Sequence, residues 1–179
     1  GLTMYVSLEP CNHKGKTNPC LSIINSKKFD RVVIAETDPN QIASGGIAEL
    51  SGKGISVDIG LLKKEARNLN RRFYTFYEEK RPYVILKYAS TLDGFIAQNN
   101  GVSKWITNKQ SRSFNHKTRA NCDAILVGSS TVLADNPNLG SHGKGKDPQI
   151  IVIDPEKKMH DMINIFHKDP IVYSRPELS

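Results

Sequence analysis

Short apolar runs, separated by stretches with helical spacing, are the feature that most constrains this fold. Residues 32–35 read Val-Val-Ile-Ala, and residues 124–128 and 150–154 are nearly as apolar. Such runs are typical of strands buried on both faces of a parallel sheet. Because strand and helix patterns alternate along the chain, the sequence predicts a layered α/β fold with a partly parallel sheet.

A charged segment, residues 78–81, is followed by Pro82 and interrupts this alternation. It marks a reasonable boundary between a domain at residues 1–80 and a second domain at residues 81–179. The strands expected are 4–8, 32–35, 55–59, 83–89, 124–128, 150–154 and 170–173. The helices expected are 19–29, 46–53 (with Gly54 ending it), 62–79, 108–120 (with Asn108 as its N-cap) and 129–134.

The amino-acid composition limits the kinds of protein to which this chain could belong. The chain is 38% hydrophobic, which is enough for a packed core, and no apolar run is long enough to cross a membrane. A net charge of +7 favours anionic ligands, either phosphorylated small molecules or nucleic acid. Three cysteines and no visible leader predict a reducing, cytoplasmic location, with Cys122 as a buried thiol. Since the chain starts at Gly1 and opens almost directly on a strand, we expect it to be part of a longer protein.

A cysteine-containing loop follows the first expected strand. Cys11 and Cys20 are separated by eight residues that include His13, Lys14 and Lys16. Two thiolates, a third ligand and a water would form an open catalytic zinc site, whereas four protein ligands would form a structural one. The two lysines would favour the thiolate forms. Two unconnected thiols, or a non-enzymatic zinc-binding α/β protein with His13 as third ligand, remain alternatives.

The loop string Glu-Pro-Cys-x-His-x-Gly-Lys-Thr-x-Pro-Cys, at residues 9–20, resembles the deaminase domain of the bifunctional riboflavin-biosynthesis deaminase–reductases. The resemblance implies that Cys11 and Cys20 bind Zn²⁺. It also implies a His ligand and a proton-shuttle Glu in a His-x-Glu segment, which does not occur in these residues, so the catalytic residue is unknown. Glu9 would be a near-site residue. The substrate contacts implied are His13, Lys16, Asp38 and Asn40. Without the resemblance, Asp38 and Asn40 would be an ordinary turn and Lys16 a solvated charge.

An ordered series of strings downstream resembles the reductase domain of the same family, which is dihydrofolate-reductase-like: residues 87–94, 103–107, 119–120, 123–128 and 131–137. The residues implied at the NADPH site are Ala89, Trp105, Thr131 and Asp135. Those implied at the substrate are Ser103, Arg119 and Leu139. From the residues alone, the only Trp in a chain is more often a core side chain than a ligand contact, and Asp135 could simply end a helix.

One departure concerns the substrate phosphate. The family continues after Asn-Pro-x-Leu with Thr-x-Arg, whose Arg contacts this phosphate, whereas Leu139 is followed here by Gly-Ser-His. The expected phosphate contact is therefore in doubt. His142, Lys144 or Lys146 could replace it.

The resemblance implies the C-terminal part of a cytidine-deaminase-like three-layer domain followed by the N-terminal part of a dihydrofolate-reductase-like domain. The implied function is zinc-dependent hydrolytic deamination of a phosphoribosylated diaminopyrimidinone and NADPH-dependent reduction of its ribosyl group to ribityl, in riboflavin biosynthesis. We expect a phosphorylated pyrimidine as substrate, no nucleic acid or membrane partner, and a homo-oligomer. We expect these 179 residues alone to be inactive and not to fold independently. A nucleic-acid base deaminase is a further alternative.

Overall fold

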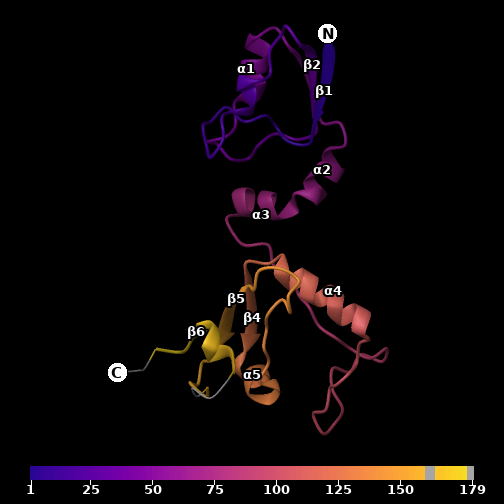
Figure 1. Cartoon of the computed structure of the whole chain (residues 1–179), viewed down its shortest axis with the longest axis vertical. Helices are drawn as coiled ribbons and strands as arrows, with labels where there is room; N and C mark the ends of the chain where they lie inside the picture. The colour runs from indigo at the N-terminus through magenta and orange to yellow at the C-terminus, as the bar shows by residue number, and fades with distance from the viewer. Residues whose placement is uncertain (160–163, 177–179) are drawn as a thin grey trace. The chain divides into compact units, whose positions relative to one another are not determined.

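The computed structural model describes residues 1–159 and 164–176. The chain divides into two compact units between Leu86 and Lys87, and each unit contains a three-stranded parallel sheet (Figure 1). The mixed α/β class with parallel strands is therefore confirmed. Among the described residues, no helix is both long and apolar enough to cross a membrane.

The first unit is built on a sheet with strand order β1-β2-β3. Its elements are β1 (Leu2–Val6), η1 (Cys20–Ser22), β2 (Phe29–Ile34), α1 (Gly46–Gly52), β3 (Ser56–Ile59), α2 (Lys63–Leu69) and α3 (Arg71–Glu79). Val6 pairs with Ile34, and Ile34 pairs with Ile59. The carboxyl ends of all three strands therefore meet at one edge, the usual position of a ligand site in parallel sheets.

A single hydrophobic core supports this sheet. Its buried residues are Leu21, Ile24, Val32, Ile34, Leu50 and Ile55, and side chains from β1, β3 and α1 pack against it. The central strand β2 is buried over its last three residues, as the apolar run at residues 32–35 predicts. Gly54, which follows α1, has a φ of 74° and ends the helix as expected.

Two helix predictions in this unit are wrong in extent. Only the 3-10 turn η1 forms within the expected helix 19–29, because the amides of Lys28 and Phe29 both donate to the Asn25 carbonyl and close a turn there. The expected helix 62–79 is two helices. Asn70, with φ −102° and ψ 23°, lies between them and breaks the helical path.

The second unit has strand order β4-β5-β6. Its elements are α4 (Lys109–Ala120), β4 (Ala124–Gly128), α5 (Ser129–Asp135), β5 (Gln149–Ile153), η2 (Asn164–Lys168) and β6 (Ile171–Tyr173). The predicted N-cap is confirmed, since the Asn108 side chain accepts from the Ser111 amide at 2.9 Å. The buried core residues are Val132, Leu139, Ile150, Val152 and Ile165.

Two predictions in this unit are also wrong. No strand forms between residues 80 and 108, all of which the structure describes, although residues 83–89 have a strand-like sequence. A strand needs a pairing partner, and β4, β5 and β6 pair only with one another. Strand β4, expected to be buried, is exposed at alternate residues, with Leu126 63% exposed.

Candidate functional site

Loops from three elements converge at the carboxyl edge of the first sheet. The cysteine loop follows β1, the Glu36–Asn40 segment follows β2, and α2 begins shortly after β3. The Glu9 amide donates to the Glu36 carbonyl at 3.0 Å, which joins the first two loops directly. The predicted deaminase residues all lie on these two loops.

The two predicted metal ligands lie side by side. The Sγ atoms of Cys11 and Cys20 are 3.5 Å apart, and both thiols are free. Two sulfurs at about 2.3 Å from one zinc, at a tetrahedral angle, would be about 3.8 Å apart. The pair therefore fits two positions of a tetrahedral Zn²⁺ site.

The contact between the two thiols affects the pKa of Cys20. The hydrogen bond with the Cys11 thiol, together with burial, raises the pKa of Cys20. Among the described residues, no group of three His, Cys, Asp or Glu side chains could hold a metal.

The predicted phosphate contacts follow Cys11 on the same loop. His13 is half-buried, and its Nδ1 atom is buried without a hydrogen-bond partner in the described part of the chain. Its Nε2 atom faces Gly15, where a Cβ would lie 3.3 Å away. Lys16 is exposed.

Glu9 is the residue that organises this edge of the sheet. Its side chain is buried, and its carboxylate accepts from the amides of Asp38 (3.1 Å), Gly45 (3.0 Å) and Ile47 (3.1 Å). Gly46 packs so closely that a Cβ there would lie 2.0 Å from the Pro10 carbonyl oxygen. The start of α1 is thereby fixed against the residue that precedes Cys11.

Asp38 and Asn40 form a turn closed by their own side chains. Asp38 Oδ1 accepts from the Asn40 amide at 2.8 Å, and Asn40 Oδ1 accepts from the Ile42 amide at 3.2 Å. The Asn40 side chain also donates to the Tyr77 hydroxyl at 3.4 Å. Both residues are half-buried, so the turn and its polar atoms form part of the loop edge.

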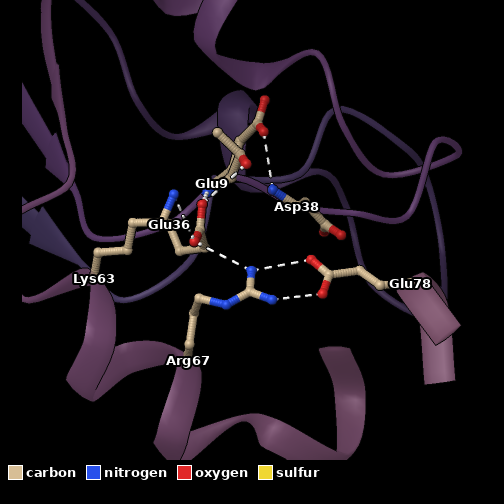
Figure 2. A network of polar contacts seen from close by, with 7 residues as sticks. Glu9, Glu36, Asp38, Lys63, Arg67 and Glu78 are labelled. Carbon is tan, nitrogen blue, oxygen red and sulfur yellow. Dashed lines mark hydrogen bonds and ion pairs between the residues drawn. The ribbon is translucent and has the colours of Figure 1, made fainter. Parts of the chain in front are cut away.

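Arg67 links the loop after β2 to helices α2 and α3 (Figure 2). Its guanidinium donates to Glu36 at 3.2 Å and makes a two-pronged contact with Glu78. Lys63 also lies 3.2 Å from the Glu36 carboxylate. Burial raises the pKa of Glu36, but hydrogen bonds from the Thr37 amide, Lys63 and Arg67 outweigh this and hold it below its usual value.

In the second unit, Ser103 and Trp105 line one hollow of about 580 Å³ formed by residues 91–106. Trp105 is 71% exposed, so the alternative that it is a core residue is wrong. The Arg112 guanidinium lies 4.2 Å from the centre of its ring. The hollow therefore offers an open aromatic wall next to a cation.

The other predicted reductase residues are spread over the unit. Thr131 and Asp135 are exposed on α5, four residues apart and so on one face, and Asp135 is its last residue. Ala89 is half-buried in the irregular segment. Leu139 is 5% exposed within the core, and the adjacent Gly140 carbonyl accepts from Arg119 at 3.3 Å.

Comparison with known proteins identifies the family. Residues 82–177 match the family described as the RibD C-terminal domain. The chain belongs to the RibD family. The riboflavin biosynthesis protein RibD of Aquifex aeolicus is 46% identical over 159 residues, which are 87% of this chain and 45% of the relative. RibD of Escherichia coli is 40% identical over 166 residues, 92% of this chain and 45% of that protein.

Solved structures of RibD proteins have the same fold. A diaminohydroxyphosphoribosylaminopyrimidine deaminase/5-amino-6-(5-phosphoribosylamino)uracil reductase from Thermotoga maritima is 39% identical, with a TM-score of 0.88 over 99% of this chain and 52% of the other. Acinetobacter baumannii RibD is 31% identical, with a TM-score of 0.83 over 98% of this chain and 56% of the other. The chain thus spans about half the length of the RibD relatives it matches. The family predicted from the motifs is confirmed.

RibD membership does not by itself explain several residues that sequence reasoning missed. Arg67 and Glu78 form a polar network with the buried Glu36 carboxylate, but in the sequence the three are ordinary charges on a strand end and two helices. His116 was also missed, and its ring stacks on that of His142. For these residues the sequence offers only the charge pattern of each segment, and that pattern does not predict which side chains will be in contact.

Proposed function

We propose that this chain is part of a bifunctional RibD protein of riboflavin biosynthesis, and that its second unit belongs to an NADPH-dependent reductase. The match of residues 82–177 to the RibD C-terminal domain is the observation that supports this most. The substrate proposed is a phosphorylated pyrimidine carrying a ribosyl group, rather than nucleic acid. The full-length protein would be a homo-oligomer.

The hollow around Trp105 suits part of the proposed cofactor site. When bound, NADPH supplies a hydride for reduction of the ribosyl group. Trp105 would present its exposed face to a flat ring system, and Ser103 would donate a hydrogen bond to the substrate. Thr131 and Asp135, on one face of α5, would contact the cofactor.

Changing the exposed tryptophan tests the reductase proposal. In the full-length protein, Trp105→Ala should raise the KM for NADPH about tenfold or more, because aromatic contacts contribute about 1–3 kcal/mol to stacked ligands. Phe114→Ala removes an aromatic side chain that is 73% exposed on α4, outside the hollow, and should leave the KM unchanged. Absence of substrate-dependent NADPH oxidation in the unmodified full-length protein would refute the proposal.

The cysteine pair supports a second activity, hydrolytic deamination of the preceding pyrimidine intermediate. When bound, Zn²⁺ supplies the Lewis acidity that brings the pKa of water near 7. Cys11 and Cys20 would hold it together with a ligand from elsewhere in the full-length protein. His13 and Lys16 would bind the substrate phosphate, and the Asp38–Asn40 turn would bind its ribose or ring.

Metal content tests the proposed zinc site without reference to activity. The full-length protein should contain one Zn²⁺ at this site, and Cys20→Ala should remove it. His13→Gln should leave the zinc content unchanged, because His13 is proposed to contact substrate and not metal. Loss of zinc from the His13 variant would instead favour the alternative of a zinc protein with His13 as a ligand.

A further inference from the structure

Arg112, in the first turn of α4, contacts the segment that carries Trp105 at two points. Its guanidinium carbon lies 4.2 Å from the centre of the Trp105 ring. The same guanidinium donates a hydrogen bond to the carbonyl of Thr107, two residues further along the chain. A planar guanidinium can stack on an aromatic face and donate hydrogen bonds in its own plane at the same time. One side chain thus holds both an indole ring and the backbone beside it.

The helix gives Arg112 a fixed base. The Asn108 side chain caps α4 by accepting from the Ser111 amide at 2.9 Å, and the Arg112 amide donates to the Asn108 carbonyl at 3.1 Å. Trp105, in contrast, lies on backbone without helix or strand and is 71% exposed. An exposed side chain on irregular backbone keeps its rotamer freedom unless another group restrains it. The half-buried Arg112 supplies such a restraint.

Arg112 approaches the indole from outside the hollow. Trp105 is one of the residues that line the hollow of about 580 Å³, whereas Arg112 is not. Because the guanidinium lies over one face of the indole, the opposite face is the one left for a flat ligand. The stack therefore decides which face of Trp105 a ligand can meet.

No carboxylate competes with the ring for this arginine. Within residues 1–159 and 164–176, the contacts of the Arg112 guanidinium are with the Trp105 ring and the Thr107 carbonyl, and no Asp or Glu forms an ion pair with it. Its positive charge is directed at the electron-rich face of the indole. Replacing Arg112 would consequently leave no carboxylate unpaired, so that a substitution there reports on the ring and the Thr107 carbonyl.

We propose that Arg112 is a positioning residue for the cofactor, because it holds the Trp105 indole in the orientation whose free face meets the flat ring system of NADPH. This inference rests on the proposed reductase function. Arg112 acts through the ring and does not itself line the hollow. A wall that is ordered before the ligand arrives spares the ligand the cost of ordering it, so the effect falls on binding. Loss of Arg112 should raise the KM for NADPH and leave kcat nearly unchanged.

Steady-state kinetics of the full-length protein give the first test. Arg112→Met should raise the KM for NADPH about two- to fivefold, as expected for loss of an exposed cation–π contact. The value of kcat should stay within about twofold. Arg112→Lys keeps a cation but not the planar stack, and should give a smaller rise. Lys117→Met removes an exposed cation from the same helix and should leave the KM unchanged.

A double-mutant cycle separates positioning from a general structural role. In the Trp105→Ala background the ring is absent, so Arg112→Met should have no further effect on the KM for NADPH. A role confined to the stability of α4 would instead add the same penalty in both backgrounds. An equal rise of the KM with and without the Trp105 ring overturns the proposal, and so does an unchanged KM in the single Arg112→Met variant.

Tryptophan fluorescence reads the restraint directly, without NADPH or turnover. Trp105 is the only tryptophan of these 179 residues, and its signal in the full-length protein is the difference between the unmodified protein and Trp105→Phe. Arg112→Met should lower the anisotropy of this signal and increase its quenching by acrylamide, because the ring gains rotational freedom and loses the cover of the guanidinium. Equal anisotropy and quenching with and without Arg112 would overturn the proposal.

The outcomes separate the role of Arg112 from the reductase function. A protein that oxidises NADPH, with Trp105 fluorescence unaffected by Arg112→Met, would refute the positioning role and leave the reductase function standing. A protein without NADPH oxidation would refute the reductase function, while a lower anisotropy in the Arg112→Met variant would still show that Arg112 restrains Trp105. A fall in kcat at an unchanged KM would also overturn the proposal, because it would place Arg112 in the reaction step and not in binding.

Discussion

Each unit brings charged side chains together, but the groups around Glu36 and those around His116 balance their charge differently. Glu36 is buried between Lys63, Arg67 and the amide of Thr37, so its charge is satisfied within the unit. His116 lies among Arg112, Arg119 and Lys144, all of the same sign. Ion pairs neutralise Glu36 within its unit, whereas every charged group that lowers the pKa of His116 is positive.

The same difference distinguishes the proposed deaminase region, around the cysteines, from the proposed reductase region, around His116. Around the cysteines, buried carboxylates hold loops in place while the proposed substrate contacts stay at the edge. Near His116, the charged Arg119 is itself a predicted substrate contact. Substitutions should therefore act on stability in the first region and on ligand binding in the second.

The largest effect is expected at the metal ligands. Cys11→Ala in the full-length protein should reduce ammonia release from the pyrimidine substrate about 10³-fold or more, because metal-assisted chemistry contributes several kcal/mol to the barrier. NADPH oxidation should be unchanged. Cys122→Ala is the matched control, since this thiol donates to the Thr118 carbonyl in the other unit, at 3.2 Å. Loss of both activities in the Cys11 variant would contradict two separate sites.

A buried carboxylate should show the next largest effect. Glu9→Gln replaces one acceptor oxygen by an NH₂ group that must face a backbone N–H, and should destabilise the first unit by about 2–3 kcal/mol. Amide hydrogen exchange of β2 would measure this locally. Glu49→Gln breaks the half-buried 2.7 Å pair with Lys53 and should cost about 0.3–0.5 kcal/mol. Equal exchange rates in the two variants would mean that Glu9 does not organise this edge.

The Glu36 network should respond to acid. Its pKa is lower in the folded protein than the value of about 4.3 expected when unfolded, so its contribution is fully present above that pH. The contribution is lost as the pH falls through the lower, folded-state pKa. Glu36→Gln should remove about 1–2 kcal/mol at neutral pH and reduce the acid sensitivity of β2 exchange. Glu65→Gln, at an exposed position of α2, should do neither.

The smallest effect is expected at Arg119. Arg119→Met removes a half-buried cation but also its hydrogen bond to the Gly140 carbonyl, and because these effects oppose each other it should change the stability of the second unit by less than about 1 kcal/mol. Exchange of β4 and β5 amides would measure this. A loss of stability comparable to that of Glu9→Gln would show that both regions balance their charge internally, and the contrast between them would fail.

Local signals in the sequence predicted much of the fold. Strand runs such as residues 32–35 and caps such as Asn108 act through nearby backbone, and the structure agrees with them. The strand-like residues 83–89 were misinterpreted because strand formation depends on a partner elsewhere in the chain. The helix expected over 62–79 divides at Asn70, where a polar residue takes a non-helical conformation.

The contacts within the candidate sites were less predictable from the sequence than the helices and strands. The spacing of Cys11 and Cys20 indicated a pair, and the thiols do meet. The Arg67 bridge joins residues up to 31 positions apart, and the stacking of His116 on His142 joins a helix to a loop. Such contacts depend on the tertiary path of the chain, and so a single sequence offered charge and position but not the partners. The roles of the remaining site residues are still predictions.

Gly46 has no functional group, yet its close contact with Pro10 limits which residues can stand at position 46 without displacing Cys11. Its Cα lies against the Pro10 carbonyl so closely that an alanine Cβ would be 2.0 Å from the oxygen, and backbone cannot yield as a flexible side chain would. A methyl group there must push Pro10 away from α1 and carry the next residue, Cys11, out of line with Cys20. The distance between the Cys11 and Cys20 thiols therefore depends on a glycine that carries no ligand atom.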